Sequence, residues 1–128
     1  MATTPSISAQ HLAPINLICG GTTLVGKEGY AVKWAGSNVV INSSQGEWCL
    51  PLVGAGAVGA PVTVAGPGSV VPVIVDEAVT AGAELTSNGS GKWETAASGD
   101  FVTAKALETS TADGDFILAV VLSGYVKA

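Results

Sequence analysis

The sequence predicts an all-β protein, a small antiparallel β-barrel or sandwich that follows an extended N-terminal arm. Two observations support this. Gly99-Asp100-Phe101 and Gly114-Asp115-Phe116 each place a Gly-Asp turn directly before an apolar run, and short Val-rich runs broken by glycine recur along the rest of the chain. Gly-Asp suits a tight turn, and aromatic and β-branched residues suit a half-buried pleated surface. Many short strands at this spacing are typical of a barrel or sandwich.

We expect one folded domain. A chain of 128 residues has room for a single core and buries roughly two-thirds of the surface of its unfolded state. Residues 1–14 are small and polar and include Pro5 and Pro14, which predicts an extended arm that a neighbour would order. Residues 15–128 are then the single β domain.

The first half of that domain is expected to contain four strands. An Ala-Gly-Ser turn lies between two of them, so residues 29–41 are predicted to form a hairpin. The expected strands are residues 15–19, 29–34, 38–42 and 48–53.

The second half is expected to begin with two hairpins. Residues 60–65 and 69–76 are predicted to pair across Gly66-Pro67-Gly68, with Pro72 on an edge strand, where a missing backbone donor is tolerated. Residues 84–87 and 92–95 are predicted to pair across the Asn-Gly turn that follows Ser87.

The C-terminal region continues the same style. The two Gly-Asp-Phe segments are expected to supply one strand each, and residues 124–126 close the chain as a further short strand. Helical periodicity is absent except for an expected single turn around residues 104–109.

The composition predicts assembly. The chain is 48% hydrophobic but only 12% charged, about half of the usual charged share of roughly 25%. Low charge is characteristic of buried interface cores, so we expect partners to cover part of the surface. The alternative is a compact monomer that its 22 serine and threonine residues keep soluble.

The charge balance makes several partners unexpected. Five lysines and no arginine against ten acidic residues give a net charge of −5, which repels nucleic acid. No apolar run reaches the length of about 18 residues that a membrane span needs, and residues 1–11 lack the features of a signal peptide. We therefore expect cytoplasmic synthesis, with Cys19 and Cys49 as buried thiols.

Two glycine motifs are interpreted as turns rather than nucleotide sites. Gly54, Gly56 and Gly59 form a G-x-G-x-x-G pattern, but Ala60-Pro61-Val62 continues as strand, so no helix follows to bind a pyrophosphate. Ser90-Gly91-Lys92 resembles the end of a phosphate-binding loop, yet Trp93 stands where a magnesium-binding hydroxyl belongs. We expect no cofactor.

Catalytic and metal sites are also not expected. Asp113-Gly114-Asp115 and Asp76-Glu77 do not match a calcium-loop spacing and are interpreted as a turn and a solvated strand end. His11 is the only histidine, so a zinc site or a serine-histidine relay has too few ligands or partners. The sequence predicts a protein that is not an enzyme.

The candidates for function are therefore surface residues that anchor contacts with other proteins. Aromatic side chains serve this role, although ordinary core packing is the alternative for each of them. The candidates are Pro5, Ile7, His11 and Leu12 in the arm, and Trp34, Trp48, Trp93 and Tyr125 in the β domain.

The region from about Val58 to Leu122 resembles the capsid decoration, or cement, proteins of tailed bacteriophages. The resemblance rests on a succession of glycine-punctuated strands and turns, and no such pattern covers residues 15–53. The segments that carry it are residues 59–64, 68–73, 78–86, 104–108 and 113–115.

The resemblance implies a function without catalysis. Such proteins sit on the outside of the mature head, commonly as trimers at three-fold and quasi-three-fold positions, and clamp neighbouring major capsid protein subunits. It implies a homotrimer on the virion exterior that stabilises the capsid, with the major capsid protein as partner. The alternative is a virion-surface adhesion or carbohydrate-binding module.

Overall fold

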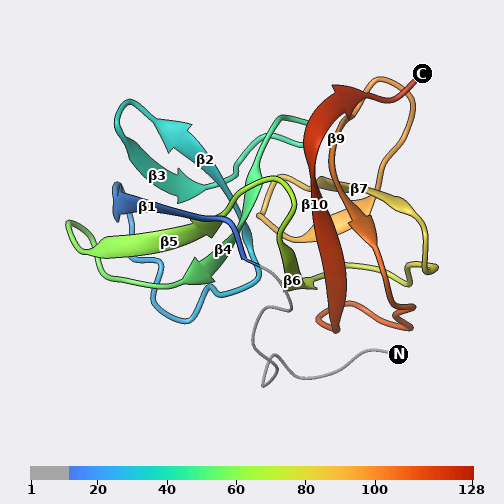
Figure 1. Ribbon diagram of the computed structural model, residues 1–128, viewed down its shortest axis with the longest axis horizontal. Helices are drawn as coiled ribbons and strands as arrows, with labels where there is room; N and C mark the ends of the chain where they lie inside the picture. Colours follow the sequence, from blue (N-terminus) through green and yellow to red (C-terminus); the bar gives the residue numbers. More distant parts are fainter. Residues whose placement is uncertain (1–11) are drawn as a thin grey trace.

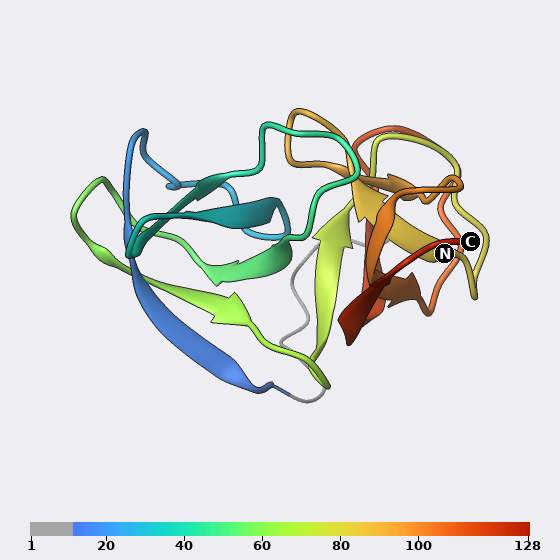
Figure 2. The same cartoon turned by 90° about the horizontal axis from the view of Figure 1, so that it is seen from above.

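The computed structural model describes residues 12–128, which form ten β-strands and no helix (Figure 1). The predicted all-β class is therefore confirmed for this part of the chain. Its strands form two groups that lie side by side along the long axis of the molecule (Figure 2). The described residues include no helix long and apolar enough to cross a membrane.

The first group is a closed barrel, the N-terminal barrel, with strand order β1-β3-β2-β4-β5. Its β1–β3 contact is parallel and its other contacts are antiparallel. The predicted hairpin of residues 29–41 is confirmed as the β2–β3 pair. The strands are β1 (Pro14–Cys19), β2 (Ala31–Ala35), β3 (Asn38–Ile41), β4 (Leu50–Gly54) and β5 (Pro61–Ala65).

The second group is the C-terminal sheet, with order β6-β10-β9-β7-β8. Its ladders are antiparallel, and a single parallel bridge between Val75 and Trp93 joins its two edge strands. Pro72 lies on an edge strand, as predicted, and the β7–β8 hairpin is confirmed. The strands are β6 (Val70–Ile74), β7 (Glu84–Ser87), β8 (Trp93–Thr95), β9 (Phe101–Ala106) and β10 (Phe116–Val126).

The two groups repeat one topology. In chain order, the first strand of each group pairs with the third in parallel and with the fifth in antiparallel orientation. The second strand pairs with the third and fourth, and the fourth pairs with the fifth. The chain therefore folds as two structural repeats, a relation that the sequence did not indicate.

The register of the repeats agrees as well. The amide of Gly29 donates to the carbonyl oxygen of Leu52 at 2.8 Å, and the amide of Gly82 donates to that of Ala106 at 2.7 Å. Both glycines have positive φ, 86° and 92°, which glycine adopts without steric cost. The cross-strand pair Val32–Leu50 of the N-terminal barrel corresponds to Leu85–Ala104 of the C-terminal sheet. The pair Leu52–Val64 likewise corresponds to Ala106–Ala119. All eight of these side chains are buried.

Three sequence predictions were wrong. Residues 124–126 are not a separate strand, because they are the end of β10. Residues 60–65 and 69–76 do not form a hairpin, because β5 pairs with β1 and β4 while β6 pairs with β10. Residues 66–69 instead connect the repeats, with the Gly66 amide bonded to Ala13 and the Gly68 amide to Val121. The helical turn at 104–109 is absent, since β9 runs to Ala106 and ends in a bend.

The repeats share one buried core and are joined by direct contacts. The backbone amide of Ala31 donates to the Gly91 carbonyl oxygen at 2.7 Å. The buried side-chain amide of Asn42 donates through Nδ2 to Ser87 Oγ at 3.0 Å. Cys49 Sγ lies 3.9 Å from Thr103 Oγ1 across the same boundary. Cys19 and Cys49 are free, buried thiols, as predicted, whereas the division into an arm and one domain remains a prediction.

Candidate interaction surface

Two tryptophans that the sequence singled out lie together on the surface of the N-terminal barrel. Trp34 is in β2 and Trp48 precedes β4, and their ring centroids are 5.4 Å apart with the planes tilted by 49°. Their exposed fractions are 37% and 36%. This geometry is that of a favourable aromatic pair, and it leaves a broad apolar surface in contact with solvent.

The tryptophan pair extends onto the C-terminal sheet. Trp48 lies against the backbone of Gly124, where a Cβ would stand 3.1 Å from its ring and 3.2 Å from the ring of Phe101. Phe101 lies opposite Val126, which is exposed. We call Trp34, Trp48 and Val126 the junction patch, because it spans both repeats. Tyr125, which adjoins Val126 in β10, lies on the opposite face of that strand and is not part of the patch.

Tyr125 lies outside the junction patch and is held by a hydrogen bond to a carboxylate that is itself ion-paired. Its hydroxyl donates to the Glu84 carboxylate, and Lys127 Nζ lies 2.7 Å from Glu84 Oε1. The hydrogen bonds from Lys127 and Tyr125 lower the pKa of Glu84, and the bond to Glu84 raises the pKa of Tyr125. The aromatic ring is thus held in place while its face remains exposed.

The other predicted contact residues do not join this patch. Trp93 is fully buried, because its strand bridges to Val75 at the closure of the C-terminal sheet, so it is a core residue. Leu12 is partly exposed next to Ala13, whose amide bonds to Ser69 Oγ at the far end of β6. The candidates Pro5, Ile7 and His11 lie outside the described residues.

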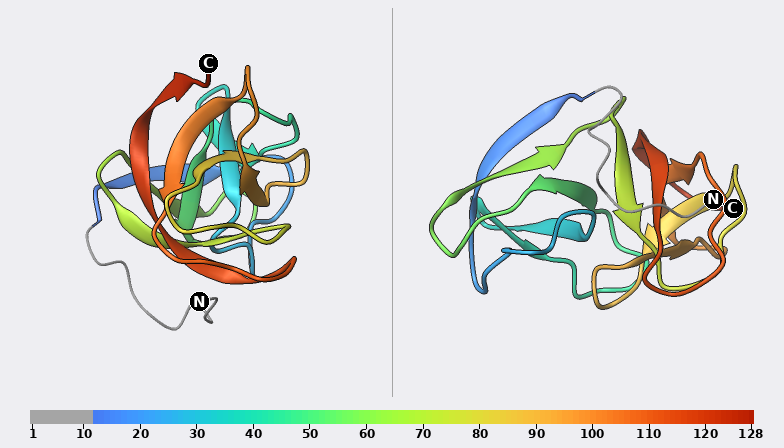
Figure 3. Two further views of the ribbon diagram at one scale, coloured as in Figure 1. Left: turned by 90° about the vertical axis from the view of Figure 1, so that its right-hand side faces the viewer. Right: turned by 90° about the horizontal axis from the view of Figure 1, so that it is seen from below.

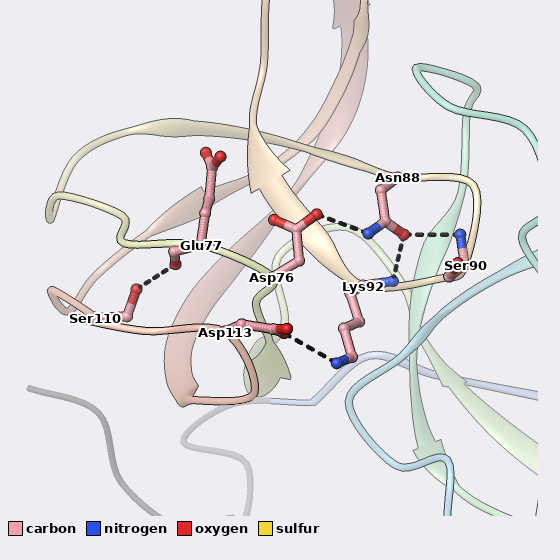
Figure 4. Close-up of polar contacts among 7 residues, drawn as sticks. All are labelled: Asp76, Glu77, Asn88, Ser90, Lys92, Ser110 and Asp113. Carbon is pink, nitrogen blue, oxygen red and sulfur yellow. Dashed lines mark hydrogen bonds and ion pairs between the residues drawn. The ribbon is translucent and has the colours of Figure 1, made fainter.

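The Ser90-Gly91-Lys92 motif is part of a hairpin turn, as predicted (Figure 4). Asn88 Oδ1 accepts the amides of Ser90 and Lys92 at 2.8 and 3.0 Å, and Asn88 Nδ2 donates to Asp76 Oδ2 at 2.7 Å. Lys92 Nζ pairs with Asp113 Oδ1 at 3.0 Å. The lysine and the asparagine side chain are therefore both occupied by contacts within the C-terminal sheet.

Acidic residues gather around this turn without forming a metal centre. No group of three or more histidine, cysteine, aspartate or glutamate side chains in residues 12–128 has a metal-binding arrangement. Burial raises the pKa of Glu94, and a hydrogen bond to Asp76 and the negative charge of Asp76 raise it further. The Gly54–Gly59 segment leads into β5 rather than a helix, as the sequence predicted.

Sequence reasoning missed Val126, Phe101 and Gly124 as parts of the surface around Trp48. Of these three residues, only Phe101 could have been singled out from the sequence, because it is an aromatic residue that directly follows a Gly-Asp turn. Trp48 likewise follows Gly46-Glu47. What placed these residues together was the contact between the two repeats, which cannot be derived from the spacing of strands along the chain.

No known family model matches this chain, and no curated protein sequence matches it.

Proposed function

We propose that this protein is a capsid decoration protein that binds the outside of a tailed-bacteriophage head and stabilises contacts between major capsid protein subunits. The junction patch is the observation that carries this proposal. It combines two partly exposed tryptophans with the exposed Val126, and tryptophan is enriched among the residues that dominate binding energy at protein interfaces. The resemblance to cement proteins supplies the class of partner.

The rigidity of the patch supports a role in binding. Trp48 lies against both the Trp34 ring and the backbone of Gly124. Side chains that are already fixed lose little conformational entropy when a partner binds. A preformed aromatic patch of this kind suits a protein that recognises one finished surface.

The physical mechanism is preferential binding. A protein that binds the intact, expanded shell better than any other state stabilises that shell by mass action. Many symmetric copies, each adding a modest contact, then resist the outward pressure of packaged DNA. The protein would act on the virion exterior after synthesis in the host cytoplasm.

The test uses heads that lack the protein, to which purified wild-type protein or a Trp34→Ala variant is added. Loss of an interface anchor costs about 2 kcal/mol or more, so we expect affinity for heads to fall about thirtyfold. Leu107→Ala is the control, because Leu107 is an exposed apolar residue outside the patch. Occupancy is read by cosedimentation and by the temperature at which DNA is released.

Two outcomes would contradict the proposal. If wild-type protein does not bind heads, or if bound protein leaves the temperature of DNA release unchanged, the stabilising role is wrong. The paired tryptophans would then favour the adhesion alternative, since aromatic rings also stack on sugars. Glycan binding by wild-type protein that Trp34→Ala abolishes would establish that alternative.

A further inference from the structure

The two repeats carry the same turn at their far ends but with different side chains. In the N-terminal barrel the β4–β5 turn is Ala57-Val58-Gly59-Ala60, and in the C-terminal sheet the β9–β10 turn is Ala112-Asp113-Gly114-Asp115. The Gly59 amide donates to the carbonyl oxygen of Cys19 at 2.9 Å, and the Gly114 amide donates to the carbonyl oxygen of Val75 at 2.8 Å. The φ values of the two glycines are 84° and 88°.

Both turns are exposed, yet only one is charged. The Asp113 side chain is 65% exposed and pairs with Lys92, as expected for a solvated tip. Val58, at the matched position, is 55% exposed and apolar. Since the same backbone accommodates an aspartate in the other repeat, local folding does not require a valine here.

Further exposed apolar residues lie on the segments bonded to the β4–β5 turn. Ile18 directly precedes Cys19, and Val25 directly follows Leu24, whose amide donates to Gly56 at 3.0 Å. Ile18 is 41% exposed and Val25 is 61% exposed. We call Ile18, Val25 and Val58 the distal patch, and residues 18–26 and 54–61 around it contain no charged side chain.

The matched residue of Ile18 is already buried in a contact between repeats. When the two repeats are aligned by strand register, Ile18 in β1 corresponds to Ile74 in β6. Ile74 is 7% exposed, and its amide donates to Gly29 of the N-terminal barrel at 3.1 Å. Within residues 12–128, the corresponding position of the N-terminal barrel is exposed, at Ile18, and has no matching contact with the other repeat.

The charge distribution indicates what covers the distal patch. Residues 70–128 hold eight acidic residues and three lysines, a net charge of −5, whereas residues 12–69 hold two of each sign and are neutral. The β4–β5 turn lies at the end of the molecule away from the C-terminal sheet (Figure 3). Copies that meet through the distal patch bury apolar surface and keep their negatively charged halves apart.

We infer that the distal patch is the surface through which copies of this chain associate with one another. The inference goes beyond the proposed function, which concerns binding to heads, and places a contact between copies on a different surface from the junction patch. The occupant is the distal patch of a second copy, because a neutral apolar surface is complementary to itself.

The test is Val58→Asp, which installs the side chain that the matched turn of the C-terminal sheet carries. Burying an unpaired carboxylate at a contact is costly, so we expect the midpoint concentration of association to rise at least about tenfold. Light scattering and sedimentation velocity across a concentration series measure it, and Val25→Asp/Val58→Asp is expected to be monomeric. Leu107→Asp, at an exposed apolar residue of the other repeat, is the control that keeps the wild-type mass.

Thermal unfolding of each variant verifies that the fold is retained. A wild-type protein that is monomeric throughout the series overturns this inference, as does an oligomer that Val58→Asp leaves unchanged. Neither result affects the proposed function, which is read from the binding of the protein to heads. An oligomer that fails to bind heads would contradict the proposed function alone.

Discussion

The two repeats of this protein agree in their interior and differ on their surface. Matched core positions such as Cys19 and Val75, or Val64 and Ala119, are all buried although their side chains differ in size. Their matched turns are both exposed, yet one presents Val58 and the other presents Asp113. Register and burial therefore define this fold, while the side chains of the two matched turns make one turn apolar and the other charged.

The largest expected effect tests whether the repeats unfold as one unit. Val39 and Trp93 occupy corresponding positions of the two repeats, where the third strand forms its parallel contact with the first strand or with the residue after it. Both side chains are fully buried in the shared core. Trp93→Ala is expected to destabilise the protein by about 3–5 kcal/mol, and Val39→Ala by about 2 kcal/mol. Because the core is continuous, we expect each variant to lower a single cooperative transition in chemical unfolding.

Trp93→Phe is the milder companion if Trp93→Ala fails to fold. Trp93 Nε1 is buried without a hydrogen-bond partner in the described residues, so the phenyl ring loses volume but no hydrogen bond. Two separate transitions, of which each variant moves only one, would show that the repeats unfold independently and do not share one cooperative core.

The strands were largely predictable from the sequence because apolar runs and glycine turns are local signals. Ser87 and Glu84, for example, bound a strand in both the prediction and the structure. The repeat was not predictable, since matched positions such as Leu50 and Ala104 share burial rather than identity. The Gly66-Pro67-Gly68 segment suits a hairpin turn equally well, and only the pairing of β5 with β1 makes it a connection between repeats.

The candidate surface was predictable only in part, for a related reason. Trp34 and Trp48 were singled out by residue type, and the structure brings them together. Trp93 belongs to the same type, but its place at the strand closure buries it. Burial of a tryptophan depends on which strands are neighbours, and that information lies in contacts between residues distant in sequence.

The contact of Trp48 with the C-terminal sheet gives the second prediction. Gly124 and Gly68 have nearly equal positive φ values, 95° and 93°, but a Cβ at Gly68 would meet no atom within 4 Å. Gly68→Ala therefore reports backbone strain alone, about 1–2 kcal/mol. Gly124→Ala adds crowding against Trp48, and we expect it to destabilise the protein more than Gly68→Ala does, by up to about 1 kcal/mol because the partly exposed Trp48 ring can shift.

Chemical unfolding measures the difference, and tryptophan fluorescence of the folded state reports the displacement of Trp48. A change in emission is expected for Gly124→Ala only. Equal costs for the two variants, with identical emission spectra, would mean that the junction between the repeats yields without strain and that Trp48 is not held there.

The smallest expected effect concerns a charge present in one repeat and absent from the other. Glu94 in β8 matches Val40 in β3, and burial beside Asp76 raises the pKa of Glu94. A carboxyl with a raised pKa in the folded state binds its proton more tightly there than in the unfolded chain. Stability is therefore lost as pH rises from the usual glutamate pKa of about 4 through the raised value.

Glu94→Gln removes this loss while its carbonyl oxygen still accepts the hydrogen bond from Gln45, which is 3.0 Å long in the wild type. At neutral pH we expect the variant to be more stable than the wild type by up to about 1 kcal/mol. The advantage should shrink as pH falls and vanish below about pH 4, where glutamate is protonated in both states. A variant that is less stable than the wild type at neutral pH would show that the Glu94 charge stabilises the C-terminal sheet, so the acidic surface of this repeat would contribute to its folding rather than only to its solvation.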